Sequence, residues 1–510
     1  MLKKKAQQCL LLLTFVVFAF TANATTYYIS NVGNDSNSGT DASSPWQTLN
    51  KLNSVSLSPG DNVLFRRGDT FYGSIVASNS GISGNPITYG AYGSGAKPVI
   101  TGFTSVTSWT NKGGNIWEST NPVSTLSSLK MVVINGVNTP MGRYPNASTS
   151  YPFLPNFFHF QSSTGTGNGN SSITSNDLSG GANWTGAEVV VRVNSWTYDR
   201  ETIASQSGNT LNYVGQATVA DVPLSNGWGF FIQNDIRTLD VQNEWYYNPA
   251  TKKISIYSVG MPTNVQVSSV ETLFYLYSNI PPVNSTSIDN LNFVGANTNA
   301  LWISGNLTFS VTNCNISYAG EEGLMLYGGG IQTGIVNNNA FSNCGSSSIF
   351  STGDVNSLSI KNNSIVGSGM ISHYKADDHS YGGVVISSPN SIVQYNSIDS
   401  SAYCSIIFTG NNIQIRNNFI NHSNLVRDDG GAIYTGFKNQ TGKVIDGNIV
   451  LNSMGNANGG GPRKTAAAYG IFIDGYGANI MITNNTIANC NNSGINLHDA
   501  QNVVVDKHCL

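Results

Sequence analysis

A six-residue motif recurs along the C-terminal part of this 510-residue chain. Each copy begins and ends with an apolar residue and carries asparagine at its fourth position, as in VNNNAF (336–341), IKNNSI (360–365) and ITNNTI (482–487). Counting one copy with cysteine there, the fourth positions are Cys314, Asn339, Asn363, Asn396, Asn418, Asn448 and Asn485. Their spacings are 25, 24, 33, 22, 30 and 37 residues. A base period with occasional insertions indicates a solenoid.

Each period also contains a second short apolar run, as in GVVISS (383–388) and GIFIDG (470–475). These runs alternate apolar and polar residues, which is typical of β-strands. A single coil of such strands buries its apolar face only against neighbours stacked about 4.8 Å away. The asparagine suits a turn residue in the left-handed conformation that bonds to the coils on both sides. The spacing of leucine-rich repeats does not occur, so we predict an all-β, right-handed parallel β-helix.

The remaining sequence predicts further segments. Residues 1–24 contain Lys3–Lys5, an apolar stretch and a small-residue site ending at Ala24, which indicate a signal peptide and a secreted, cell-surface or periplasmic protein. Residues 25–104 are expected to form an N-terminal cap, with a helix near 46–55, and the first coils. Residues 105–283 lack the repeat and are rich in aromatic residues, which predicts an inserted β-domain. Coils follow over 284–510, and the chain ends inside an apparent strand, so we expect the natural sequence to continue.

Composition excludes several classes of function. The net charge is −3, and no basic block follows the first residues, which argues against nucleic acid as a partner. The N-terminal apolar stretch is too short to span a bilayer comfortably and no other long one follows, so we expect no integral membrane segment in the mature chain. The cysteines lack CxxC spacing, which disfavours a zinc site or a disulfide framework. Without a phosphate loop, HExxH or a dinucleotide motif, no cofactor is expected.

The three longest steps of the repeat place their extra residues at the same point of the coil. The inserts are VGSGMISHYKADDHSY (366–381), NHSNLVRDD (421–429) and LNSMGNANGGGPRKTAAAY (451–469). Solenoids gather insertions on one face, often the binding face, so these loops should share one rim. Charged residues are only 10% of the chain, against about 25% in an ordinary domain. Much of the charge of the repeat region falls in these loops, together with two histidines: His373, Lys375, Asp377, Asp378, His379, Arg427, Asp428, Asp429, Arg463 and Lys464.

The second strands can be aligned on their leading residues. In this register Ala432 and Tyr434 face inward, whereas Thr435, Asp474 and His498 face outward on neighbouring coils. Asp474 is the single carboxylate of that outward column. It is either a site residue or an ordinary aspartate before a glycine turn.

VRDDGGAIYTG (426–436) and AAYGIFIDGYGANIMITNNTI (467–487) carry a resemblance to a known group. They resemble the right-handed β-helix glycoside hydrolases related to glycoside hydrolase family 141, in the pectin-lyase-like superfamily. VVINGVNTPMGRYPN (132–146) and GAEVVVRVNSWTYDRETI (186–203) resemble the β-domain that interrupts the helix in that group. The resemblance covers most of the mature chain. It implies hydrolysis of a poly- or oligosaccharide by two carboxylates, one protonated and one ionised.

Asp429 and Asp474 match the positions that the resemblance assigns to the two carboxylates. Arg427 and Asp428 could set their pKa values apart, because a nearby cation lowers and a nearby carboxylate raises the pKa of an aspartate. In fully extended register the two would lie six residues, or about 20 Å, apart. Paired glycosidase carboxylates lie about 5–9.5 Å apart. The pairing therefore requires a sharp bend at Gly430–Gly431, which glycine permits. Without it, Asp377, Asp378 or Asp428 is the better partner.

The candidate site thus has two groups of residues. The catalytic candidates are Asp429, Asp474 and Asp428, and no metal ligand is assigned among them. The candidates for substrate binding are Arg427, His373, Lys375, Asp377, Asp378, His379, Thr435, Arg463 and His498.

Two other functions fit the same residues. A polysaccharide lyase would eliminate across a uronate, using Lys375, His373 or His379 as base beside Arg427. Asp377 and Asp378 would then hold Ca²⁺. A non-catalytic carbohydrate-binding surface solenoid would use the same rim without chemistry, since one fold hosts many functions.

Overall fold

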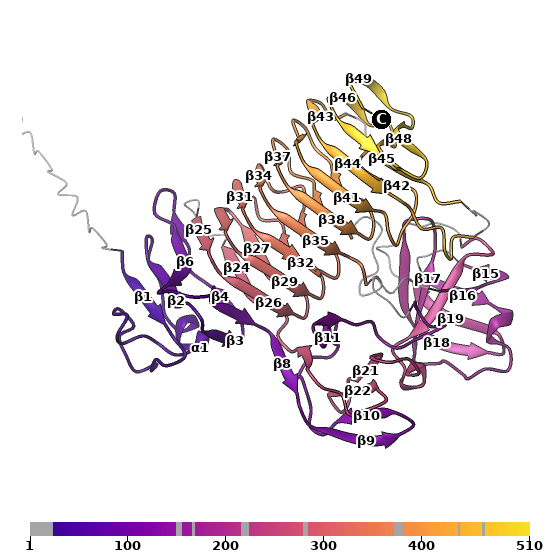
Figure 1. Ribbon diagram of the computed structural model, residues 1–510, viewed down its shortest axis with the longest axis horizontal. Coiled ribbons are helices and arrows are strands. Elements are labelled where there is room, and N and C mark those ends of the chain that lie inside the picture. Colours follow the sequence, from indigo (N-terminus) through magenta and orange to yellow (C-terminus); the bar gives the residue numbers. More distant parts are fainter. Residues whose placement is uncertain are drawn as a thin grey trace, which may run out of the picture.

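The computed structural model describes residues 24–148, 156–165, 169–215, 224–278, 284–371, 381–436, 439–461 and 465–509. Within these ranges a solenoid is built from one 13-stranded and two 10-stranded sheets (Figure 1). Successive strands of the chain fall on successive sheets, and each strand pairs in parallel with its counterpart in the next coil. This is the parallel β-helix that the repeat predicts.

The three sheets are named A, B and C here. Sheet A contains β1 (Thr26–Ile29), β2 (Asn62–Arg66), β6 (Ile87–Tyr92), β25 (Asn284–Asp289), β28 (Leu307–Thr312), β31 (Thr333–Asn337), β34 (Leu358–Lys361), β37 (Ile392–Gln394), β40 (Gln414–Arg416), β43 (Lys443–Asp446), β46 (Ala478–Thr483) and β49 (Gln501–Asp506), with β5 (Gly81–Ile82) paired to β25. Sheet B contains β3 (Thr70–Tyr72), β7 (Val99–Thr101), β26 (Asn292–Ala296), β29 (Asn315–Ala319), β32 (Ala340–Ser342), β35 (Ser364–Ser368), β38 (Ser397–Ser401), β41 (Phe419–Ser423), β44 (Ile449–Ser453) and β47 (Thr486–Ala488). Sheet C contains β4 (Ile75–Ala77), β24 (Phe274–Ser278), β27 (Leu301–Gly305), β30 (Leu324–Leu326), β33 (Ile349–Ser351), β36 (Val384–Ile386), β39 (Ile406–Phe408), β42 (Gly430–Thr435), β45 (Ala468–Ile473) and β48 (Ser493–Leu497).

One apolar core runs along the lumen of the coils. Its members include Ile365, Ile398 and Ile420, which follow one another on sheet B and are all fully buried. Burial of an aliphatic side chain of this size contributes about 1.5–3 kcal/mol. Because each inward residue rests on its equivalents in adjacent coils, the core forms only when the coils stack in register.

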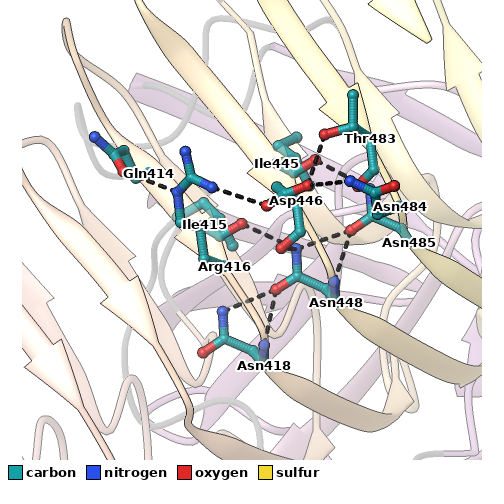
Figure 2. Close-up of polar contacts among 10 residues, drawn as sticks. All are labelled: Gln414, Ile415, Arg416, Asn418, Ile445, Asp446, Asn448, Thr483, Asn484 and Asn485. Atoms are coloured by element: carbon teal, nitrogen blue, oxygen red, sulfur yellow. Dashed lines mark hydrogen bonds and ion pairs between the residues drawn. The ribbon is translucent and has the colours of Figure 1, made fainter. Parts of the chain in front are cut away.

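The ladder asparagines, Asn339, Asn363, Asn396, Asn418, Asn448 and Asn485, are buried and connect the coils. Asn418 is representative (Figure 2). Its Nδ2 donates to Asn448 Oδ1 at 2.9 Å, as drawn in Figure 2. It also donates to Val393 O at 2.9 Å. Its Oδ1 accepts from the backbone N–H and the Nδ2 of Asn396, at 3.0 and 2.9 Å. The predicted bonding to both neighbouring coils is confirmed.

The left-handed conformation falls one residue earlier than predicted. Asn338, Asn362, Asn417 and Asn484 have φ between 51° and 58°. The ladder residue that follows each of them is not among the residues with positive φ. The left-handed residue turns the chain, and the buried asparagine after it bonds along the stack. The prediction that one asparagine does both is therefore wrong.

A second polar network ties the coils together on the outside of sheet A (Figure 2). Asp446 Oδ2 accepts from Arg416 Nη1 at 2.8 Å, one coil earlier. Its Oδ1 accepts from Asn484 Nδ2 at 2.8 Å and from Thr483 Oγ1 at 2.7 Å, one coil later. The bonds from Asn484 and Thr483 lower the pKa of Asp446. One carboxylate thus holds three coils in register.

The N-terminal cap contains a short helix, α1 (Leu49–Asn53), which buries Leu49 and Leu52. The helix is shorter than the predicted 46–55 because Trp46 forms an extended bridge to Ile29, and Thr48 then caps the helix by accepting from the Lys51 N–H. In the described part of the chain, no helix is long and apolar enough to cross a membrane. Residues 1–23 of the predicted signal peptide lie outside the described residues.

An inserted region leaves the solenoid after β7 and returns at β24, which pairs with β4 and β27. The coils therefore resume inside the range 105–283, earlier than the sequence pattern indicated. The insert has mainly antiparallel sheets and separate cores. Its strands are β8 (Phe103–Val106), β9 (Trp109–Gly113), β10 (Ile116–Ser119), β11 (Val132–Ile134), β12 (Val137–Asn138), β13 (Arg143–Tyr144), β14 (Phe158–His159), β15 (Ser162–Thr164), β16 (Gly169–Thr174), β17 (Glu188–Arg192), β18 (Tyr198–Ser207), β19 (Thr210–Gly215), β20 (Gly229–Gln233), β21 (Trp245–Asn248), β22 (Lys253–Tyr257) and β23 (Val265–Ser268), with 3₁₀ turns η1 (Asn176–Leu178) and η2 (Ile236–Thr238).

Replacing Asn418 by alanine should destabilise the solenoid strongly. The change removes one side chain's bonds to both adjacent coils and leaves buried partners unsatisfied, at about 1–3 kcal/mol each. We expect urea denaturation to show a loss of roughly 3 kcal/mol or more in the free energy of unfolding. The exposed Asn356 provides the control, since Asn356→Ala should change stability by less than about 0.5 kcal/mol. Equal midpoints for the two variants would contradict a structural role for the ladder.

Extending the ladder by one residue should stabilise it. Cys314 occupies the ladder position, and its Sγ lies 3.9 Å from Ile288 O, the carbonyl equivalent to the one that Asn418 Nδ2 bonds. In Cys314→Asn the new amide would reach Ile288 O and Asn339 Oδ1. Each bond is expected to add about 0.5–1.5 kcal/mol. The thermal denaturation midpoint should exceed that of Cys314→Ala, and a lower midpoint would show that the site does not accept the amide.

Candidate active site

Two of the inserted loops meet at one rim of the solenoid, as the position of the insertions predicts. Asn456 N–H donates to Arg427 O at 3.0 Å. Asp428 Oδ1 accepts from the Ala467 N–H at 2.5 Å, and Asp429 N–H donates to Ala467 O at 2.7 Å. These contacts join the loop after β41 to the loop after β44.

The inserted domain packs against this rim, beside the C-terminal coils (Figure 1). Asp428 N–H donates to Ser195 O at 3.1 Å, and Arg427 Nη1 donates to Trp196 O at 2.7 Å. The Arg427 guanidinium also lies 3.9 Å from the centre of the Tyr381 ring. The insert therefore fixes the loop that precedes β42.

These contacts bury two of the predicted site residues. Arg427 is 0% exposed and Asp428 is 1% exposed. Their side chains join the rim to the insert and to the neighbouring loop. The structure gives both residues a structural contact in place of the predicted roles, substrate binding for Arg427 and catalysis for Asp428.

Strand β42 is shifted by one residue from the register that the sequence predicts. Ile433 pairs with Ile406 and Ile471 and joins the core, so Tyr434 lies in the outward column. Gly431 pairs with Tyr469, whereas the alignment of the sequence paired it with Gly470. The prediction that Tyr434 faces inward is wrong.

The same shift moves Thr435 into the interior. Its side chain is fully buried, and its Oγ1 donates to Phe408 O at 2.6 Å. The predicted outward position of Thr435 is therefore wrong, and burial keeps it from contacting a substrate.

The predicted bend at Gly430–Gly431 is also wrong, because both glycines lie within β42. The chain bends one residue earlier, at Asp429 itself, whose φ is 59°. This bend replaces the one at the glycines that the pairing of Asp429 with Asp474 was expected to need. The glycines are required by close packing instead. A Cβ on Gly430 would lie 2.3 Å from Asn424 Oδ1, and one on Gly431 would lie 2.7 Å from Phe472 Cβ.

Asp474 is held by donors on both of its carboxylate oxygens. Tyr434 Oη donates to Oδ2 at 2.9 Å, and Gly475 N–H donates to Oδ1 at 2.8 Å. His498 Nδ1 lies 2.7 Å from Oδ1, so the predicted proximity of His498 to Asp474 is present. The carboxylate is half-buried, whereas His498 is exposed. The arrangement orients the carboxylate firmly at the end of sheet C.

The negative charge of Asp429 also affects the pKa values of Tyr434 and His498, the two side chains that contact Asp474. Burial chiefly raises the pKa of Tyr434, and the charges of Asp474 and Asp429 raise it further. The hydrogen bond to Asp474 chiefly raises the pKa of His498, and Asp429 adds to this. Asp429 is half-buried, and its carbonyl accepts from Tyr403 Oη at 3.1 Å. Both carboxylates therefore act on one group of side chains.

Aromatic side chains form a cluster next to Tyr434, which donates to Asp474. The ring centres of Tyr434 and Phe472 are 5.5 Å apart, and those of Tyr469 and Phe472 are 4.6 Å apart. Sequence reasoning missed all three residues. The alternation in AYGIFI (468–473) places Ile471 and Ile473 in the core and Phe472 on the other face, which was a signal for Phe472 but not for Tyr469.

The remaining candidates cannot be placed. His373, Lys375, Asp377, Asp378, His379 and Arg463 lie outside the described residues. The Ca²⁺ ligands considered for a lyase, Asp377 and Asp378, are among them.

Comparison with known proteins agrees with this architecture. The family described as "Right handed beta helix region" matches residues 299–463. A solved structure titled "Glycoside hydrolase" superposes with a TM-score of 0.72 at 14% identity, covering 95% of this chain and 96% of the other. XylC in complex with xylose gives a TM-score of 0.56 at 15% identity, covering 92% of this chain and 70% of XylC. This chain is a right-handed parallel β-helix protein.

A short part of the β-helix protein also resembles a curated enzyme. Lacto-N-biosidase from Bifidobacterium longum subsp. longum is 40% identical over 87 residues, which cover 16% of this chain and 5% of that enzyme. The solved structures share the fold at low identity, so they do not fix the chemistry. The relation to glycoside hydrolase family 141 stays a prediction.

Removing the Asp474 carboxylate should lower the pKa of His498. The ordinary pKa of histidine is 6.5, and the bond to Asp474 raises it in the folded protein. The pair therefore stabilises the fold fully below pH 6.5, and this contribution is lost as the pH rises through the raised pKa. An NMR titration of the His498 ring should show a lower pKa in Asp474→Asn. Asp399→Asn is the control, because Asp399 pairs with His422 on sheet B. An unchanged His498 pKa in Asp474→Asn would contradict the contact.

Proposed function

We propose that this β-helix protein is a glycoside hydrolase and that Asp429 and Asp474 form its pair of catalytic carboxylates. The observation that carries the proposal is proximity. Tyr434 Oη and His498 Nδ1 lie 2.9 and 2.7 Å from the Asp474 carboxylate, and Asp429 lies near enough for its carboxylate, when ionised, to raise the pKa of both residues. Hydrolysis of a glycosidic bond requires two carboxyl groups that flank the bond, in different protonation states.

The hydrogen bonds suggest which carboxylate has which role. Asp474 receives donors from Tyr434 and Gly475 on different oxygens, an arrangement that matches an ionised carboxylate. We assign it to the attack on the anomeric carbon, directly or through water. Asp429 would give its proton to the glycosidic oxygen as the bond to the leaving sugar breaks, and water then supplies the hydroxyl and the returning proton.

The surroundings of the pair suit a sugar. The half-buried rings of Tyr434 and Tyr469 offer apolar surface with polar edges, which suits the mixed character of a pyranose ring. The similar proteins support the same class, since they include a glycoside hydrolase, a xylose complex and a lacto-N-biosidase. We therefore propose a poly- or oligosaccharide as substrate. An external glycan would agree with the signal peptide predicted for residues 1–24.

Hydrolysis is favoured over β-elimination by the position of Arg427. A lyase needs a cation at the surface to neutralise the uronate carboxylate. Arg427 is fully buried and donates to Trp196 O, so it does not offer that charge to a ligand.

Replacing either carboxylate by its amide should abolish most of the activity. A positioned acid or base contributes about 10²–10⁴-fold to the rate. We expect Asp474→Asn and Asp429→Asn each to lower kcat by about 100-fold or more on a panel of glycans, measured as release of reducing ends. Asp399→Asn is the matched control, because it alters an Asp–His pair on another sheet and should retain full activity.

Three results would contradict the proposal. Unsaturated sugar ends that account for all reducing ends would indicate a lyase. Binding of glycans without cleavage would indicate a carbohydrate-binding solenoid. Full activity in both amide variants would show that other residues carry out the reaction.

A further inference from the structure

One coil of the solenoid has a lysine, Lys443, in its otherwise mainly apolar lumen. The neighbours of Lys443 at the same lumen position are aliphatic: Ile480 pairs with it in the next coil, and Ile413 lies beside it in the preceding coil, bonded through its carbonyl to the Val444 N–H. Both isoleucines are buried core residues. An ammonium group therefore lies at a position where the two adjacent coils have isoleucine.

A second polar residue faces it in the same coil. Thr435 pairs with Ile473 of the next coil and bonds to Phe408 of the preceding one, and both of those are core residues. Lys443 Nζ donates to Thr435 Oγ1 at 3.0 Å and to Gly436 O at 3.2 Å. The polar pair Lys443–Thr435 thus stands where both adjacent coils have an apolar pair.

Burying this ammonium group is unfavourable in itself, and the Phe408 ring, whose centre lies 5.8 Å from Lys443 Nζ, offsets only part of that cost. Lys443 is 1% exposed, and burial lowers its pKa to about 8. Removing an ammonium from water is unfavourable, and a hydrophobic residue of similar volume is often as stable or more stable. Buried polar residues that interrupt an apolar core are expected mainly at functional sites.

The segment that Lys443 holds lies directly against the carboxylate of the candidate site. Thr435 O accepts from the Asp474 N–H at 2.9 Å. Gly436 packs so closely on Asp474 that a Cβ there would lie 3.0 Å from Asp474 O. Tyr434, the donor to Asp474 Oδ2, is the residue before Thr435. Any shift of this segment would move both the backbone support and the side-chain donor of Asp474.

We propose that Lys443 is a positioning residue of the site formed by Asp429 and Asp474. Its ammonium group fixes Thr435 and Gly436, and through them the placement of Tyr434 and Asp474. The catalytic consequence rests on the proposed function, whereas the geometric consequence does not.

The decisive variant is Lys443→Met, which gives this coil the aliphatic lumen of its neighbours. We expect it to fold with a denaturation midpoint at or above that of the wild type. The Asp474–His498 bond should loosen, so the pKa of His498 measured by NMR should fall toward 6.5. On a cleaved glycan, kcat should fall about 10- to 100-fold, as for small displacements of catalytic groups. KM should change by less than about twofold, because the direct contacts to substrate remain.

Ile413→Met is the matched control, since it alters the same lumen position one coil earlier without touching Thr435. It should leave kcat and the pKa of His498 unchanged. Wild-type values of both quantities in folded Lys443→Met would overturn the proposal, because Lys443 would then only fill space.

Two further arms keep the test decisive. If Lys443→Met does not fold, Lys443→Gln replaces it: the shorter neutral amide should lower both quantities to intermediate values, and wild-type values would overturn the proposal. If the wild type cleaves no glycan, the proposed function fails, but the His498 pKa in Lys443→Met still tests the positioning role.

Discussion

The register of the coils depends on buried asparagines that bond in both directions along the stack. Each ladder amide satisfies backbone groups of its neighbours, so a coil displaced by one residue would leave several buried polar groups unpaired. Apolar stacking also opposes a slip of one residue, which would turn the apolar side chains outward, but the directed amide bonds add a penalty that depends on exact position. Asp446 adds a second set of bonds between coils on the outside of sheet A. The candidate site relies on this register, since Tyr434 and Asp474 belong to adjacent coils.

The inserted domain performs a different structural task. It meets the solenoid where the loops after β41 and β44 converge, and Arg427 is buried between the two parts. A buried guanidinium is stable there because it donates to Trp196 O and lies over the Tyr381 ring. The charged loop is thereby fixed rather than solvent-exposed. Asp429 follows directly, half-buried and in a left-handed conformation.

Sequence patterns predicted the architecture well and the site only in part. Period and alternation are local properties, so the β-helix, the ladder positions and the shared rim of the described loops could all be inferred. The DGG sequence was misread because two glycines look like a bend. In the structure they instead allow the backbone of β42 to approach Asn424 and Phe472 closely. That error of one residue exchanged the positions of Tyr434 and Thr435, since strand faces alternate with period two.

The sequence by itself determined the repeat, the apolar lumen and the buried asparagines, because each follows from the spacing of residue types within one coil. Only the tertiary structure decided which carboxylates share partners. The hydrogen bond between Tyr434 and Asp474 joins residues 40 positions apart, and loop lengths within a coil do not reveal such a contact. The same holds for Lys443, whose significance appears only when its aliphatic neighbours along the lumen are known. Packing across coils, not local preference, places these groups.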